Sequence, residues 1–442
     1  MSRPHSGPSL VRAVGPWVLA ASIFNVTVGG GIFRAPGVIA GPLGAAAPLA
    51  YLVCAAAFAL IVCCIAEAGS RVARTGGAYA YVETAFGSFA GFLTGALVWT
   101  IGSLALGAVA SILAGNLGAA FPALATPVGR TLLLVSVFGI FAAVNVLGVK
   151  QGARLVTVGS IAKLLPLLVL VVLSIPAIDR ANLVVADPPS AGSLARASMV
   201  LVFVFAGIES AIVPSGEVRE PARTVPRAVA IAMIGVTILY LAIQVTAQGV
   251  LGSRLAAGSP VPLADVARVA IGEWGYSMVL VGATISMLAY VSGMVLALPR
   301  QLYAFAEDGF LPRALGAVHP RWRTPWVAIL VQAAISCAIA IASSFDQLLV
   351  ITNAVTLVLY LGCVVAAFEL RRRDVRDGQG TPVRLPLGPT IHILAGAFIL
   401  VMLTSIAPRE WGLVAAVVGV AIAIYLVTRI VRRDLTPAQG KP

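Results

Sequence analysis

Charged residues are scarce in this sequence. Only 11% of its 442 residues are Asp, Glu, Lys or Arg, whereas 60% are hydrophobic. This charged share is less than half of that in a typical soluble domain. Apolar runs long enough for the ~20 residues of a bilayer crossing recur along the whole length. The composition therefore excludes an ordinary soluble fold and predicts an all-α integral membrane protein.

Cysteine and histidine are also few. The five cysteines lie in apolar stretches, none forms a C-x-x-C pair, and the three histidines are far apart. We expect no disulfide framework and no metal site. The P-loop, G-x-S-x-G and H-E-x-x-H motifs are missing as well. These absences predict that the chain does not hydrolyse ATP, is not an enzyme and carries no cofactor.

The apolar runs and the polar residues between them predict twelve transmembrane helices. The predicted spans are 14–40, 46–66, 86–118, 127–148, 156–176, 195–215, 228–250, 275–299, 325–343, 346–369, 389–407 and 411–430. The first run is too long for a signal peptide and has no A-x-A site, so we expect it to stay in the mature chain. The spans form a single membrane domain with short tails at 1–13 and 431–442.

The distribution of Lys and Arg between the two sides of the membrane tests the count of twelve spans. With the N-terminus inside and one crossing per span, 22 of the 30 Lys and Arg residues fall on the inside, six on the outside and two within spans. This asymmetry follows the positive-inside rule, and one span more or fewer would destroy it. The net charge of +13 therefore indicates cytoplasmic loops rather than nucleic-acid binding. We expect a multi-pass protein of the cytoplasmic (inner) membrane with both termini in the cytoplasm.

Two spans contain residues that interrupt helices. The first carries Gly29, Gly30 and Gly31 in succession, and the sixth combines Gly207 with Glu209. Backbone groups freed by a broken helix cannot face lipid, so they line a cavity or bind a ligand. The two spans each open a set of five, so the sets run in opposite orientations, as in inverted-repeat transporters with a midplane site. The alternative is that these glycines only allow close helix packing.

The interrupted spans suggest a site for both ends of an α-amino acid. Amides at Gly29, Gly30 and Gly31 suit a carboxylate, because a helix N-terminus carries free N–H groups and a positive dipole end. Carbonyls near Phe203 and Ala206, where the first half of span six ends, suit an ammonium group. This hypothesis depends on both helices being broken.

Three ionisable residues lie within spans. Lys163 is roughly 12 Å into span five, where it either snorkels to the interface or titrates and couples transport to protons. Glu209 is a gate, a proton carrier, a contact for a substrate amine or a structural partner for the loosened backbone. Arg34 either binds a carboxylate in an outer vestibule or reaches the outer interface.

Several segments together resemble the amino acid–polyamine–organocation (APC) transporter superfamily. Residues 28–33 (V-G-G-G-I-F) are similar to its first-helix G-x-G-I-F element, and residues 74–87 to its inner-loop pattern S-G-G-x-Y-x-Y…F-G. Residues 205–211 (F-A-G-I-E-S-A) with 216–228 resemble its sixth helix and following loop. Residues 307–312 (E-D-G-F-L-P) with 324–325 resemble its loop after helix eight. The resemblance covers nearly the whole chain.

The resemblance implies a LeuT-type fold with a 5+5 inverted repeat. The first repeat would occupy 14–176, the second 195–369, and two extra helices 389–430. The substrate would lie between helices one, three, six and eight. The resemblance implies a carboxylate held by amides of Gly30 and Gly31 and an amine held by carbonyls near Thr27, Phe203 and Ala206.

The same resemblance implies further roles for residues of helices three, five and eight. Ile101 and Gly102 would form a pocket wall on helix three. Lys163 would take the place where sodium-coupled relatives hold a cation, which favours proton coupling. Phe203 and Met294 would face the substrate.

The substrate is predicted less directly. The I-E-S-A stretch is similar to that of basic amino acid and polyamine exchangers. A flat cation, however, prefers aromatic rings, and of the two expected facing residues, Phe203 and Met294, only Phe203 has one. We therefore expect proton-coupled uptake of a neutral amino acid, with a basic amino acid or polyamine antiporter as the alternative. A passive facilitator, a membrane enzyme and a substrate sensor remain further options. The expected partners are an amino acid, protons and lipid, with a homodimer as an option and without nucleic acid.

Overall fold

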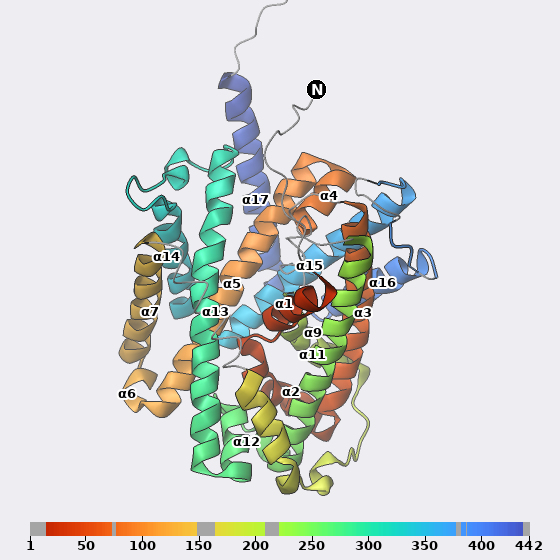
Figure 1. The fold of residues 1–442 in the computed structure, drawn as a ribbon, viewed down its shortest axis with the longest axis vertical. Coiled ribbons are helices and arrows are strands. Elements are labelled where there is room, and N and C mark those ends of the chain that lie inside the picture. Colours follow the sequence, from red (N-terminus) through yellow and green to blue (C-terminus); the bar gives the residue numbers. More distant parts are fainter. Residues whose placement is uncertain are drawn as a thin grey trace, which may run out of the picture.

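The computed structural model describes residues 15–72, 77–147, 164–207, 221–376, 382–385 and 387–435, and every element in these ranges is a helix (Figure 1). This confirms the all-α expectation. The α-helices are α1 (Pro16–Thr27), α2 (Ala35–Leu43), α3 (Ala47–Arg71), α4 (Ala78–Phe86), α5 (Ser88–Ala120), α6 (Pro122–Ala125), α7 (Pro127–Leu147), an unlabelled helix Leu164–Leu173, α9 (Ala191–Phe205), α11 (Pro221–Leu251), α12 (Pro262–Ile271), α13 (Glu273–Glu307), α14 (Trp326–Ala342), α15 (Phe345–Arg372), α16 (Thr390–Thr404) and α17 (Pro408–Leu435). Short 3-10 helices include η1 (Gly30–Phe33), η2 (Gly44–Ala46), η4 (Arg180–Leu183), η6 (Gly252–Ala256) and η7 (Arg313–Gly316).

Many of these helices are long and apolar enough to cross a membrane. Seven helical stretches meet this condition within the described ranges: Ala35–Arg71, Ser88–Ala120, Pro127–Leu147, Arg223–Ala256, Glu273–Glu307, Phe345–Arg372 and Pro408–Arg429. Four shorter apolar helices accompany them: Leu164–Leu173, Ala191–Phe205, Trp326–Ala342 and Thr390–Thr404. The chain is therefore a multi-pass membrane protein, because one or two such helices would already require a bilayer.

Two helices, α4 and α12, lie in segments that the sequence analysis left between spans. Glycines in left-handed backbone separate each from the long helix that follows: Gly87 (φ 88°) precedes α5 and Gly272 (φ 88°) precedes α13. In α12 one face is buried through residues such as Leu263 and Val266. Both helices are too short to cross a bilayer. A search of the sequence for long apolar runs therefore does not find them.

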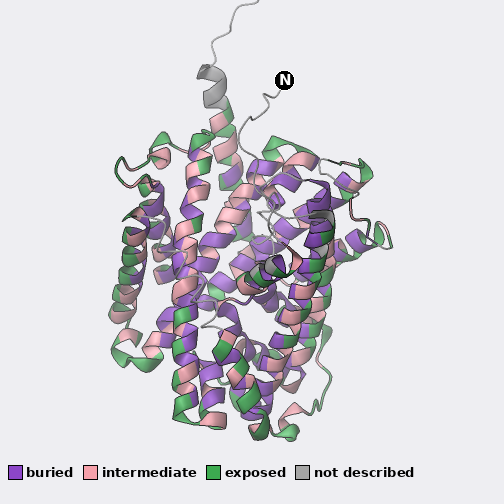
Figure 2. Ribbon diagram, viewed as in Figure 1, coloured by how far each residue is buried: buried purple, intermediate pink, exposed green. Residues whose placement is uncertain are grey.

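The helices differ in how deeply they lie in the bundle (Figure 2). Helices α5 and α15 are the most buried of the long helices and contact each other extensively. Helices α7 and α17 have the smallest buried shares among the seven candidate spans, and α7 lies at one edge of the bundle in Figure 1. The interior is therefore built around α5 and α15.

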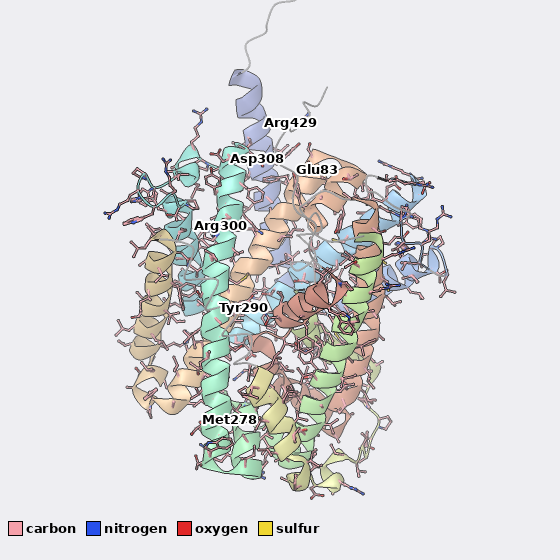
Figure 3. All side chains as sticks on the ribbon, in the orientation of Figure 1. Glu83, Met278, Tyr290, Arg300, Asp308 and Arg429 are labelled. Atoms are coloured by element: carbon pink, nitrogen blue, oxygen red, sulfur yellow. The ribbon has the colours of Figure 1, made fainter. Side chains whose placement is uncertain are left out.

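The two ends of the bundle can be named by the helices that mark them. Figure 3 shows Glu83, Asp308 and Arg429 near the end that carries α4, which we call the α4 end. Met278 lies toward the opposite end, which carries α12 and which we call the α12 end. Tyr290 lies near the middle of α13 (Figure 3) and therefore marks the mid-depth of the bundle.

A buried ion cluster joins α3, α15 and α16 near the α4 end. Glu67 is fully buried and lies 3.0 Å from Arg71 and 3.2 Å from Arg371. His392 Nε2 lies 3.7 Å from the same carboxylate, and Arg71 also reaches Asp374 at 3.5 Å. Asp374 lies outside the apolar span, and its pKa is lowered mainly by the hydrogen bond that Arg376 donates to it. The cluster satisfies charges that burial alone would make costly.

Candidate functional site

The first apolar span is interrupted at its glycines, as the sequence predicts. Helix α1 ends at Thr27, and the amide of Val28 still donates to the carbonyl of Phe24 at 2.9 Å. Gly29 is extended, with φ −95° and ψ −165°, and η1 begins at Gly30. The amides that start a new helix have no partners within it, so the interruption leaves N–H groups without helical hydrogen bonds at the buried residues Gly30 and Gly31.

The described helix of the sixth predicted span ends beside the interruption of the first. Helix α9 ends at Phe205, Ala206 is extended, and Gly207 has φ 118°. A Cβ atom at Gly207 would lie 3.1 Å from Cγ1 of Val26 in α1. The ends of α1 and α9 are therefore packed against each other.

Tyr240 on α11 connects α1 and α9. Its hydroxyl donates toward the carbonyl oxygen of Thr27 at 2.9 Å and that of Val204 at 3.0 Å. Its ring is fully buried, in edge-on contact with Tyr51 and Phe205. The sequence analysis missed Tyr240, because a tyrosine in an apolar helix gives no signal of its partners.

The carbonyl of Thr27 accepts a second bond, from the amide of Gly29 at 2.8 Å. The single proton of the Tyr240 hydroxyl is shared between this oxygen and the carbonyl oxygen of Val204, whereas the Gly29 amide donates to the Thr27 oxygen. Of the three carbonyl positions predicted to hold an amine, Thr27 is already occupied by the protein itself.

Helices α5, α9 and α13 surround the glycines of the first interruption. A Cβ at Gly30 would lie 3.2 Å from Val109 on α5 and 3.4 Å from Met287 on α13. A Cβ at Gly31 would lie 3.0 Å from the ring of Phe203 on α9. Met287 is three residues before Tyr290 on α13, so the glycines lie near mid-depth. The glycines permit a backbone approach that any side chain would prevent.

The residues predicted to contact the substrate from helices three and eight lie on α5 and α13, but not at the level of Val109 and Met287. A Cβ at Gly102 would lie 3.4 Å from the terminal carbon of Met294, so α5 and α13 do bring these two positions together. Ile101 is buried beside them. Gly102 and Met294 are each seven residues from Val109 and Met287, roughly 10 Å closer to the α4 end. The sequence analysis did not name Val109 and Met287, which are the residues in contact with Gly30.

The two residues predicted for proton coupling or gating, Lys163 and Glu209, lie outside the described residues. The structure resumes at Leu164, the first residue of a described helix, and pauses after Gly207. Arg34, in contrast, is described and lines a cavity toward the α12 end.

A helical bundle in which an interrupted first span meets the end of α9 at mid-depth has the construction of a membrane transporter. Comparison with known proteins agrees with this class. Residues 14–428 match the model of the amino acid permease family. The chain belongs to that family, within the APC superfamily.

Three relatives are similar over most of the chain. An uncharacterised transporter of Mycobacterium tuberculosis is 32% identical over 92% of this chain and 89% of its own length. The serine/threonine exchanger SteT of Bacillus subtilis is 27% identical over 87% and 89%. The branched-chain amino acid permease BcaP of the same organism is 26% identical over 91% and 89%.

Proposed function

We propose that this chain is a secondary active transporter that carries a neutral amino acid across the cytoplasmic membrane. Twelve crossings in a LeuT-type 5+5 arrangement, with two further helices, are part of the proposal. Each of the twelve ranges predicted from the sequence contains a described helix or, for the first, the interrupted pair α1 and α2. The distribution of Lys and Arg supports an orientation in which the α4 end and both termini face the cytoplasm.

The observation that carries the proposal is that the interruption of the first span meets the end of α9. Gly207 packs on Val26, and Gly31 packs on Phe203. Amides from Gly30 and Gly31 then provide an anion site next to the end of α9 at Ala206, whose carbonyl suits a cation. Since the carbonyl of Thr27 is engaged by Tyr240 and Gly29, we assign the amine to the carbonyls of Phe203 and Ala206.

The side chains around the glycines favour a neutral substrate. Val109, Met287 and Phe203 are apolar and close to Gly30 and Gly31. A guanidinium or ammonium side chain of a basic substrate would find no carboxylate among these three residues. The names of the two Bacillus relatives, which refer to serine, threonine and branched-chain amino acids, support the same substrate class.

The proposed energy source is the proton gradient, with Lys163 as the group that titrates and Glu209 as a gate. This part is supported by the sequence, where both residues lie inside apolar spans. Exchange is the second candidate for coupling, because SteT is named an exchanger. Exchange would transfer the main role from Lys163 to Glu209.

Uptake into proteoliposomes tests these assignments. We would measure labelled serine, threonine, leucine, arginine and putrescine, with an inside-alkaline pH gradient, without it, and with amino acid preloaded inside. Gradient-driven accumulation of a neutral amino acid that is lost in Lys163→Ala supports proton symport. Uptake that needs internal amino acid and ignores the gradient replaces symport with exchange. Uptake of arginine or putrescine alone would overturn the substrate class.

A further inference from the structure

A cavity of about 420 Å³ lies between Arg34 at the start of α2, the last turns of α5, the start of α7 and the turn that joins α14 to α15. This volume is within the range of small-molecule sites. Its wall includes the charged residues Arg34, Arg130 and Asp346 together with Ser111 and Phe345. Arg34, for which the sequence offers carboxylate binding as one of two interpretations, lines it, but none of the residues predicted to hold the substrate at the glycine interruption does, so the cavity is distinct from that interruption.

Arg34 has unused binding capacity in this cavity. One terminal nitrogen, Nη1, donates to the carbonyl of Ser259 at 3.3 Å, while the other, Nη2, is not among the buried atoms and has no hydrogen-bond partner among the described residues. The guanidinium carbon lies 5.8 Å from the centre of the Phe345 ring. Within the described ranges no carboxylate pairs with Arg34. A carboxylate ligand is its natural complement, because a guanidinium binds one through two parallel hydrogen bonds.

Arg130 cross-links the helices that form the cavity wall. Its Nη2 donates to the carbonyl of Ala340 at 2.8 Å and to Oγ of Ser111 at 2.9 Å, and its Nη1 donates to the carbonyl of Ile341 at 3.3 Å. These bonds cap the end of α14 and tie it to α5 and α7. Arg130 is therefore a positioning residue, and its positive charge adds to that of Arg34.

The cavity carries one negative charge against two positive charges. Asp346, in the first turn of α15, is exposed and is the acidic residue of the wall. It can attract the ammonium group of a zwitterion while Arg34 takes the carboxylate. A polyamine has no carboxylate and would face a net positive wall.

An aromatic pair connects this cavity with the glycine interruption. Phe345, which lines the cavity, is in edge-on contact with Phe203 at 6.1 Å between ring centres. Phe203 in turn packs against Gly31. A ligand in the cavity is thus separated from the interruption by the rings of Phe203 and Phe345.

We propose that this cavity binds the free carboxylate of an amino acid through Arg34 before the substrate passes Phe203 and Phe345, and that its positive wall excludes polyamines. The proposal rests on the proposed function, which places the α12 end outside and makes amino acids the substrates. It adds a selection step that precedes binding at the glycines.

Thiol labelling at the cavity tests this assignment without transport. Ala342 is exposed and lines the cavity, so Ala342→Cys puts a reactive thiol there. The full chain in nanodiscs would be labelled with anionic sulfonatoethyl methanethiosulfonate or cationic trimethylammonium-ethyl methanethiosulfonate, with the unsubstituted chain as background for the native cysteines. The probes are L-leucine, L-threonine, and isopentylamine, which is leucine without its carboxylate.

We expect at least one of the two amino acids to slow labelling several-fold, and isopentylamine to leave the rate unchanged. Adding Arg34→Gln should abolish this protection and lower the anionic-to-cationic rate ratio about twofold or more. Arg34→Lys should keep the ratio, because it keeps the charge. Arg254→Gln, at an exposed arginine outside this cavity, is the matched control and should change neither quantity.

Protection that survives Arg34→Gln, or equal protection by isopentylamine, would overturn the proposal. The melting temperature of each variant shows whether it is folded. Because labelling needs no net transport, protection without uptake in proteoliposomes would retain the cavity and refute the transport function. Uptake without protection would retain the transport function and refute the role of the cavity.

Discussion

The hydroxyl oxygen of Tyr240 lies 2.9 Å from the carbonyl oxygen of Thr27, at the residue where α1 ends. The same hydroxyl lies 3.0 Å from the carbonyl of Val204, one residue before the end of α9. One side chain of α11 thus holds both α1 and α9 at their free carbonyl ends. Any movement of α1 relative to α9 must break or exchange at least one of these bonds.

Tyr240→Phe should lower stability and impair transport. It removes the hydroxyl and leaves two buried carbonyls without this donor, which costs about 1–3 kcal/mol. We expect a lower melting temperature of the purified protein and slower uptake. Tyr425→Phe is the control, because Tyr425 packs on Phe310 and Phe92 through its ring and its hydroxyl forms no hydrogen bond within the part of the chain that the structure describes. Equal melting temperatures for the two variants would contradict the bridging role.

Gly31→Ala should disturb the interruption, since the added Cβ would lie 3.0 Å from the Phe203 ring. Overpacking of this kind costs about 1–3 kcal/mol. Gly41→Ala, in the following helix, places its Cβ in open space and should be neutral. In the double variant Gly31→Ala with Phe203→Leu, the two losses in melting temperature should be less than additive. Full additivity would show that the two residues do not meet.

Gly207→Ala should destabilise the protein through its backbone. Gly207 has φ 118°, a conformation that residues with a Cβ rarely adopt, and the new Cβ would lie 3.1 Å from Val26. Strain of this kind costs of order 1–3 kcal/mol. Gly192→Ala, near the start of α9, meets no close contact and is the control. Thermal unfolding of the two variants in the same detergent measures the difference, and equal melting temperatures would refute it.

Glu67→Gln should weaken the attachment of α15 and α16 to α3. It leaves Arg71 and Arg371 near each other without the buried carboxylate that both contact, and breaking a buried ion pair costs about 3–5 kcal/mol. Asp187→Asn removes an exposed carboxylate and should change stability by less than about 0.5 kcal/mol. Since the cluster is buried, high salt should not remove the difference between the variants in thermal unfolding. A difference that disappears in high salt would indicate a solvent-exposed pair.

Parts of the candidate site follow from local residue types. The run of Gly29, Gly30 and Gly31 predicts the interruption of the first span, and the structure has it there, because three glycines weaken any helix regardless of its neighbours. The end of the sixth span near Ala206 is predicted for the same kind of reason. The resemblance predicts Ile101 and Met294 beside the substrate, and this stays a prediction. The side chains that a Cβ at Gly30 would meet, those of Val109 and Met287, follow only from the tertiary structure.

The sequence by itself determined the class of protein, the apolar helices and the position of the first interruption, because these depend on composition and on residues close together in the chain. Only the tertiary structure decided which side chains meet at the interruption. Tyr240 is 213 residues from Thr27, and Arg130 is 210 residues from Ala340. Such pairs depend on how far each helix slides and rotates against the next, and an apolar helix carries little sequence signal for either.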